Sequence, residues 1–172
     1  MKRLDGYYTN EYDDSKFDKQ HSIGGNYYLK YLVNDRWSVT LNVKHLANRN
    51  YGSFTLAPDK DAAFADPFKV NQNAVAKLVD NTFNTSLTAN YTGHHFNFST
   101  QTSYQSNYRY YATPIDGDFS PADAITIINN YGNKWNNIKV VTEELRFTSP
   151  ASSASAPEMD SWQLLVLSKR SK

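Results

Sequence analysis

Apolar and polar residues alternate along much of the chain, and this pattern predicts β-strands. The alternation is clearest over residues 81–91, where Phe83, Leu87 and Tyr91 lie on one face and Asn, Thr and Ser residues fill the other. The predicted strands, about six in all, are residues 2–9, 23–33, 37–45, 81–91, 96–105 and 138–148. The sequence therefore predicts an all-β fold whose strands each have one apolar and one polar face.

Tight turns and long connections alternate between these strands. The tight turns are residues 34–36 and 92–95, and the long connections are residues 10–22, 47–80 and 112–133. Within the last two connections we expect short helical turns at residues 73–79 and 121–128, the second capped by Ser120. Short turns at one end and long loops at the other are typical of antiparallel up-and-down β-barrels of outer membranes.

Alternation alone permits two architectures, because both need one apolar face. In a soluble β-sandwich the polar face meets water, whereas in a transmembrane barrel the apolar face meets lipid and the polar face lines the lumen. The strands run about ten residues, the length that crosses a bilayer at a tilt. Tyr, Phe and Trp gather near strand ends, as in the aromatic girdles of barrels. Together these features favour an antiparallel up-and-down transmembrane β-barrel segment with long extracellular loops.

Composition agrees with a sheet that has one wet face. The chain has 172 residues, enough for one domain or a piece of a larger one, and a net charge of +1, which indicates no nucleic-acid partner. It has 13 Tyr and no Cys, so disulfides, thiolate metal sites and a Cys nucleophile are excluded. No segment approaches the roughly 18 apolar residues of a membrane-spanning helix. We expect no signal peptide in this stretch, because Leu4, Asp5 and Gly6 stand where an apolar run should begin.

Few residues suggest chemistry. His94 and His95 share a tight turn, where a metal site would need a third ligand from elsewhere in the fold. Asp116, Asp118 and Ser120 match the first ligand positions of a calcium loop, but the Gly and the closing Glu of that loop are missing, which leaves a looser calcium-binding or loop-folding role open.

Several polar side chains are predicted to face the lumen and line a substrate path, with a generic wet lumen as the alternative: Lys30, Lys44, Lys139, Asn42 and Gln101. There is no phosphate-binding loop, nucleophile elbow or catalytic triad. The sequence thus predicts neither an enzyme nor a resident cofactor or metal.

The last third of the chain resembles TonB-dependent outer-membrane receptors of the siderophore-receptor-like branch. The resemblance rests on residues 116–123 (DGDFSPAD), residues 135–136 (WN) and residues 142–150 (TEELRFTSP), with residues 5–10 (DGYYTN) as an earlier strand and loop. It covers about residues 2–155, and its weight comes from the order and spacing of the motifs.

This resemblance implies a function for a larger protein. The intact receptor would bind a scarce nutrient complex, a ferric siderophore, and import it across the outer membrane with energy relayed through TonB. The chain would be an internal barrel fragment, without the plug domain, the energy-coupling region and the signal peptide, and inactive alone. Two alternatives stay open: a soluble secreted β-sandwich that binds glycans, and a complete small barrel that acts as an adhesin or passive pore.

Residues 156–172 depart from the family, which continues with a strand beginning Lys-Trp-Thr-Ala-Gly and an aromatic residue. Read one base further on, the codons of Glu158 and Met159 give Lys or Arg and then an obligatory Trp, and those of Trp162 and Gln163 give an obligatory Gly. With an AGY codon at Ser161 the shifted frame permits Lys-Trp-Thr-Ala-Gly-Ser. We therefore expect residues 1–155 to be partial barrel and residues 156–172 to be an out-of-frame, non-native tail.

Genomic DNA tests this hypothesis. We expect the frame shifted by one base near codon 155 to stay open and to encode further alternating strands. An open continuation in the present frame alone, with no barrel-like sequence in the shifted one, would contradict the frame shift.

Overall fold

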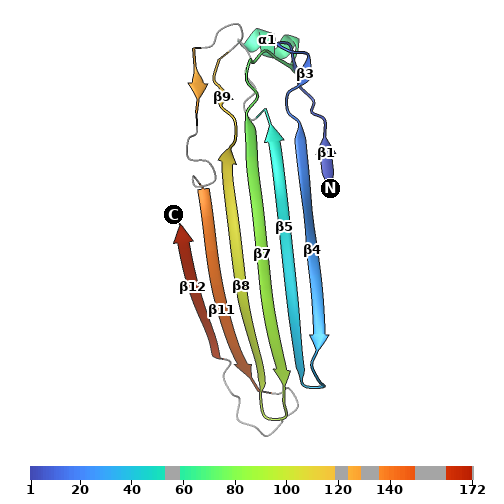
Figure 1. Ribbon diagram of the computed structural model, residues 1–172, viewed down its shortest axis with the longest axis vertical. Coiled ribbons are helices and arrows are strands. Elements are labelled where there is room, and N and C mark those ends of the chain that lie inside the picture. Colours follow the sequence, from blue (N-terminus) through green and yellow to red (C-terminus); the bar gives the residue numbers. More distant parts are fainter. Residues whose placement is uncertain (53–58, 119–123, 129–135, 150–161, 172) are drawn as a thin grey trace. The chain divides into compact units, whose positions relative to one another are not determined.

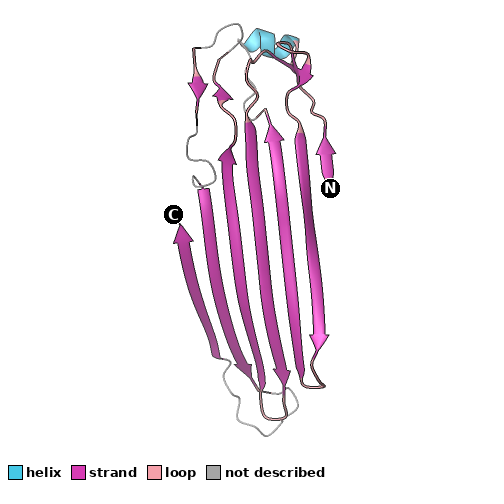
Figure 2. Cartoon of the chain, viewed as in Figure 1, coloured by secondary structure: helices cyan, strands magenta, loops and turns pink. Residues whose placement is uncertain are grey.

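The computed structural model describes residues 1–52, 59–118, 124–128, 136–149 and 162–171, for the last of which only the course of the backbone is given (Figure 1). The fold is all-β and mostly antiparallel, as the alternation predicts (Figure 2). Seven strands form one sheet in the order β1-β4-β5-β7-β8-β11-β12. In the described residues this sheet is open, with β1 at one edge and β12 at the other.

The strands of this sheet are β1 (Lys2–Leu4), β4 (Gln20–Leu32), β5 (Trp37–Tyr51), β7 (Lys77–Thr92), β8 (Asn97–Tyr111), β11 (Asn136–Thr148) and β12 (Trp162–Ser171). The short strands β2 (Thr9–Asn10), β3 (Ser15–Lys16) and β6 (Lys69–Val70) form a second sheet, in which β2 and β6 run parallel. A third sheet pairs β9 (Ile115–Asp116) with β10 (Thr126–Ile127), and α1 spans Lys60–Ala65.

Two sequence predictions about local structure are wrong. Residues 2–9 are not one strand, because Gly6 adopts a φ of 95°, and Asp18 Oδ1 accepts hydrogen bonds from the backbone N–H groups of Tyr7 (2.7 Å) and Tyr8 (2.8 Å). Residues 73–79 are not helical either. Lys77 opens β7 there, and its carbonyl accepts a bond from Ala112 N–H at 2.7 Å, which holds the backbone extended.

The helix predicted over residues 121–128 is also replaced. Thr126–Ile127 is strand β10, while the predicted helix start, Ser120, lies outside the described residues. The helix α1 forms elsewhere in the same long connection, where Asp59 Oδ1 accepts a bond from Ala62 N–H at 2.8 Å and caps its N-terminus.

The chain divides into two compact units. The loop unit comprises Met1–Gly24, Leu46–Asn81 and Tyr108–Asn137, and the strand unit comprises Gly25–His45, Thr82–Asn107 and Ile138–Lys172. Each is described below by itself.

Tight turns in the strand unit follow from single residues. Asn34 Oδ1 accepts hydrogen bonds from the backbone N–H groups of Arg36 and Trp37, both at 2.9 Å, so its side chain closes the first turn. In the second turn Gly93 N–H donates to Phe96 O at 3.1 Å, and a Cβ at Gly93 would lie 2.8 Å from that oxygen. The two predicted tight turns are thus confirmed.

The loop unit has a small mixed core. Its buried apolar side chains are Phe17, Val70, Ala76, Leu78, Val79 and Ile115, and its buried polar side chains are Asn10, Gln72 and Asp116. At its margin, Lys69 Nζ lies 2.7 Å from Asp66 and 3.3 Å from Glu11, and these hydrogen bonds raise the pKa of Lys69. The core of the loop unit therefore combines buried polar side chains with buried apolar ones.

Backbone pairing extends into the part of the chain predicted to be out of frame. β12 runs antiparallel to β11, with Trp162 opposite Phe147 and Ser171 opposite Ile138. The frame shift concerns codons, so it stays a prediction for the DNA.

Replacing Gly52 by Ala tests the loop-unit core. Gly52 has a φ of 64°, and a Cβ there would lie 2.7 Å from the backbone oxygen of Phe17, which is 1% exposed. We expect Gly52→Ala to lower the free energy of unfolding by about 2 kcal/mol or more, because it adds both backbone strain and a steric clash. Urea titration measures the change.

Gly25→Ala is the matched control, because its Cβ would meet only the movable ring end of Tyr27. We expect the control to stay within about 1 kcal/mol of the parent chain. Equal stability of the two variants would contradict this account of the core.

Candidate functional site

One face of the strand unit is aromatic. Trp37 packs on Tyr91 at 5.0 Å between ring centroids, Tyr91 on Phe96 at 5.4 Å, and Phe98 on Phe147 at 4.7 Å. These five rings line one wholly apolar hollow. We call the side of the strand unit that carries them the aromatic face.

The same face carries a second row of rings. Tyr27 stacks on His45 at 5.7 Å, and Phe83 contacts Tyr104 at 6.4 Å. The two rows stand eight residues apart, which corresponds to about 27 Å of extended chain. The pairs are Trp37 and His45 on β5, Tyr91 and Phe83 on β7, and Phe96, just before β8, with Tyr104 on β8. Apolar residues between the rows, among them Leu41 and Leu87, are 38% and 49% exposed. Both side chains therefore keep part of their apolar surface exposed.

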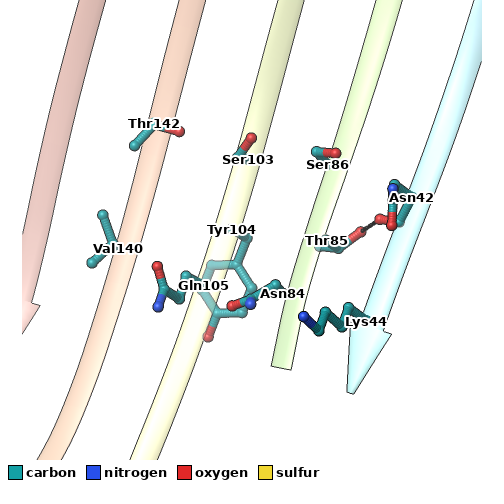
Figure 3. A pocket seen from close by; sticks show the side chains of 10 residues that line it. All are labelled: Asn42, Lys44, Asn84, Thr85, Ser86, Ser103, Tyr104, Gln105, Val140 and Thr142. Atoms are coloured by element: carbon teal, nitrogen blue, oxygen red, sulfur yellow. Dashed lines mark hydrogen bonds between the residues drawn. The ribbon is translucent and has the colours of Figure 1, made fainter. Parts of the chain in front are cut away.

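The opposite face of the strand unit is polar. Figure 3 shows the side chains that line a hollow of about 230 Å³ there, among them Asn42, Lys44, Asn84, Ser86 and Gln105. Further along the strands Thr88 Oγ1 bonds to Gln101 Oε1 at 3.3 Å, and Gln101 Nε2 donates to Ser103 Oγ at 3.2 Å. Amides and hydroxyls dominate this face, with Lys44 as the cation in the hollow.

The prediction that Lys139 lies on the polar face is wrong. Glu143 and Phe147 on β11 contact residues of the aromatic face, and β11 keeps an unbroken register with β12 from Ile138 to Phe147. Lys139 stands four residues from Glu143, so it shares that face, while Val140 and Thr142 line the polar hollow. Lys44, Asn42 and Gln101 lie on the polar face as predicted.

Glu143 is a carboxylate on the mainly apolar aromatic face. Its Oε1 accepts a hydrogen bond from Thr100 Oγ1 at 2.6 Å, and its Oε2 accepts one from Thr102 Oγ1 at 2.5 Å. Both threonines come from β8, so each carboxylate oxygen has a donor.

The loop unit contains two hollows that share Leu4, Lys19, Gln20 and Tyr51. Their volumes are about 420 and 430 Å³. Basic and aromatic side chains line them: Arg3, Lys16, Lys19, His21, Arg109, Tyr7, Tyr51 and Tyr111. The carboxylates are Asp5, which pairs with Arg3 at 3.0 Å, and Asp18, so basic groups outnumber acidic ones.

The residues considered as metal ligands in the sequence have different surroundings in the structure. No group of three or more His, Asp or Glu side chains that could hold a metal ion occurs among the described residues, so the pair His94 and His95 gains no third ligand there. Asp116 is 3% exposed, and its carboxylate bonds to backbone N–H groups. Ser120 lies outside the described residues. In the described ranges no helix is long and apolar enough to span a membrane.

Sequence reasoning missed two sets of residues. It did not find the buried cluster of Asn10, Gln72 and Asp116, because these residues are 62 and 44 positions apart and follow no local pattern. It also missed Glu143 and Lys139 on the aromatic face. Val140 and Val141 are adjacent and lie on opposite faces of β11. Because each face then carries an apolar residue, the sequence does not show which face is the apolar one.

In comparisons with known proteins, no family model, no curated protein and no solved structure matches this chain.

Proposed function

We propose that this chain is a section of the barrel of a TonB-dependent outer-membrane receptor that takes up a scarce nutrient complex such as a ferric siderophore. The observation that carries the proposal is the two-faced strand unit. Its aromatic face has partly exposed apolar side chains between two rows of rings, while its other face is lined by amides, hydroxyls and Lys44. Such a sheet suits two different solvents, lipid on one side and water on the other.

The spacing of the two aromatic rows supports a membrane location. A transmembrane strand needs about 9–11 residues at a tilt, and rings collect where the apolar band meets water. Tyr91 and Phe83 bound a segment of that length on β7, and Phe96, just before β8, and Tyr104 on β8 bound another. Lys139 lies eight residues from Phe147, at the level where a lysine head group reaches the interface.

Glu143 is the side chain that fits this proposal least easily, because it lies four residues from Phe147 and so within the proposed apolar band. Acidic side chains cost less at the bilayer midplane than the roughly 2–4 kcal/mol of Lys or Arg. The hydroxyls of Thr100 and Thr102 donate to both of its oxygens and reduce that cost further.

The loop unit supports ligand capture. Its two hollows have the size of small-molecule sites and carry an excess of basic groups beside tyrosine rings. This chemistry suits an anionic ligand. The intact receptor would couple to TonB through an N-terminal region, and this chain alone would transport nothing.

Paired labels on adjacent residues test the membrane location. The chain has no Cys, so Leu87→Cys and Ser86→Cys each accept a single nitroxide on opposite faces of β7. In lipid vesicles that contain the whole receptor we expect the label at position 87 to collide mainly with dissolved oxygen, which concentrates in lipid. We expect the label at position 86 to collide mainly with a water-soluble nickel chelate. Electron paramagnetic resonance measures both collision rates.

The soluble β-sandwich predicts another result. A chain that is monomeric and cooperatively folded without detergent, with both labels shielded from lipid, would exclude the membrane proposal and favour a glycan-binding module.

Uptake tests the transport class. In the bacterium that carries the gene, deletion of the whole receptor gene should abolish uptake of at least one labelled ferric siderophore under iron limitation. Deletion of TonB should have the same effect. Unchanged uptake across a panel of ferric siderophores would contradict the proposed ligand, whatever the labels report.

A further inference from the structure

The loop unit holds a cluster of side-chain oxygen atoms, two of which, Gln72 Oε1 and Asp118 Oδ1, are buried and accept no hydrogen bond within the described residues. It is formed by Gln72, just after β6, and by Asp116 and Asp118 at the β9–β10 hairpin. We infer that this cluster, the Gln72–Asp118 site, binds one calcium ion. The inference does not depend on a membrane location or on transport.

The surroundings of the Gln72 side chain indicate a ligand. Its side chain is 1% exposed, and its Nε2 lies 3.4 Å from the backbone oxygen of Asp116, so the amide group is directed at the hairpin. Its backbone is held on both sides by Asn10, whose Nδ2 donates to Gln72 O at 2.8 Å and whose Oδ1 accepts from Gln72 N–H at 3.0 Å. The Gln72 Oε1 atom is buried and accepts no hydrogen bond within the described residues. A buried amide oxygen without a donor is costly, and a cation removes that cost.

Asp116 brings a buried negative charge. It is 3% exposed, and its two carboxylate oxygens each accept one backbone N–H, from Asn73 and from Asp118, both at 3.0 Å. It forms no ion pair in the described ranges. A carboxylate has about four acceptor positions, so lone pairs remain for a metal ion. Buried charges in proteins are usually paired or coordinate metals.

Asp118 supplies another oxygen. Its Oδ2 accepts bonds from Ala124 N–H (2.5 Å) and Ile125 N–H (2.7 Å), which fixes the side chain across the hairpin. Its Oδ1 is buried, and no donor reaches it from the part of the chain that the structure describes. The side chain is thus already ordered before any ion binds, which favours a specific site.

The donor set selects calcium. All candidate ligands are oxygens, from two carboxylates, one amide and the Asp116 carbonyl, and hard cations prefer oxygen. Calcium accepts six to eight oxygens in flexible geometry and tolerates neutral ones, whereas magnesium demands a near-ideal octahedron. Two carboxylates predict weak binding, with a Kd of about 0.1–1 mM, the range of extracellular modules.

Calcium titration of the full chain tests the site. We expect saturable binding of one ion by equilibrium dialysis with radioactive calcium. Asp118→Asn should weaken binding about tenfold, because the amide keeps one oxygen for Ala124 and Ile125 but replaces the other by NH2. Gln72→Glu should tighten binding about tenfold, because it turns the amide oxygen into a third carboxylate.

Asp13→Asn is the matched control. Asp13 belongs to the same unit, but it is exposed and is not a candidate ligand: its carboxylate accepts a bond from Ser15 N–H at 3.1 Å and bonds to the side chain of Asn10. We expect this variant to bind calcium like the parent chain. Amide exchange at Asn73, Ala124 and Ile125 reports in each variant whether the hairpin is folded.

Three results would overturn the inference. The first is a folded hairpin with no saturable calcium binding up to about 10 mM, far above the expected Kd. The second is equal binding by Asp118→Asn and Asp13→Asn with the hairpin folded, which marks diffuse attraction to acidic side chains. The third is equal affinity for magnesium and calcium.

Discussion

The two-residue repeat of the β-strand is the constraint on which this structure depends. Because successive side chains point to opposite faces, each long strand sends alternate residues into two environments. Ring contacts from Tyr27 to Phe147 mark one face in the strand unit, and a polar hollow with Lys44 marks the other. A one-residue slip of register would exchange the faces completely. Tight turns set by Asn34 and Gly93 fix the register of their hairpins, so these two residues help determine which side is aromatic.

Backbone pairing at the sheet edges sets a second constraint. β1 pairs with β4 only from Gln20 to Ser22, so the rest of β4 has a neighbour on one side alone within the described residues. In water such an edge is solvated, but in lipid each unpaired backbone group costs several kcal/mol. Under the proposed function the sheet therefore needs further strands to be stable in a bilayer. Under that proposal the aromatic face would meet lipid, and the open edge would pair with further strands of a larger barrel.

The sequence predicted the central strands well, because alternation over residues 81–91 and 96–105 reports burial of one face directly. It placed their ends poorly. β5 continues to Tyr51 and β8 to Tyr111 through mixed polar and aromatic residues that show no clean period. The helix expected at residues 73–79 fails for a related reason. Its spacing of apolar residues suits a helix, but pairing with the end of β8 overrides this local preference.

The loop unit could not be predicted, because its order comes from side-chain bonds between distant segments. Asp18 fixes the backbone of Tyr7 and Tyr8, and Asn10 fixes that of Gln72. With Phe17 as its largest buried apolar side chain, the unit has little apolar area to offset the entropy of ordering long connections. Hydrogen bonds in which backbone N–H groups donate to carboxylate and amide oxygens offset this entropy instead. They also give partners to backbone groups that would otherwise be buried without any. Such a core concentrates negative charge and unshared oxygen atoms in its interior. The polar bonds that order the loops are therefore also what makes their interior suited to a cation, while the basic residues around the two hollows suit an anion at the surface.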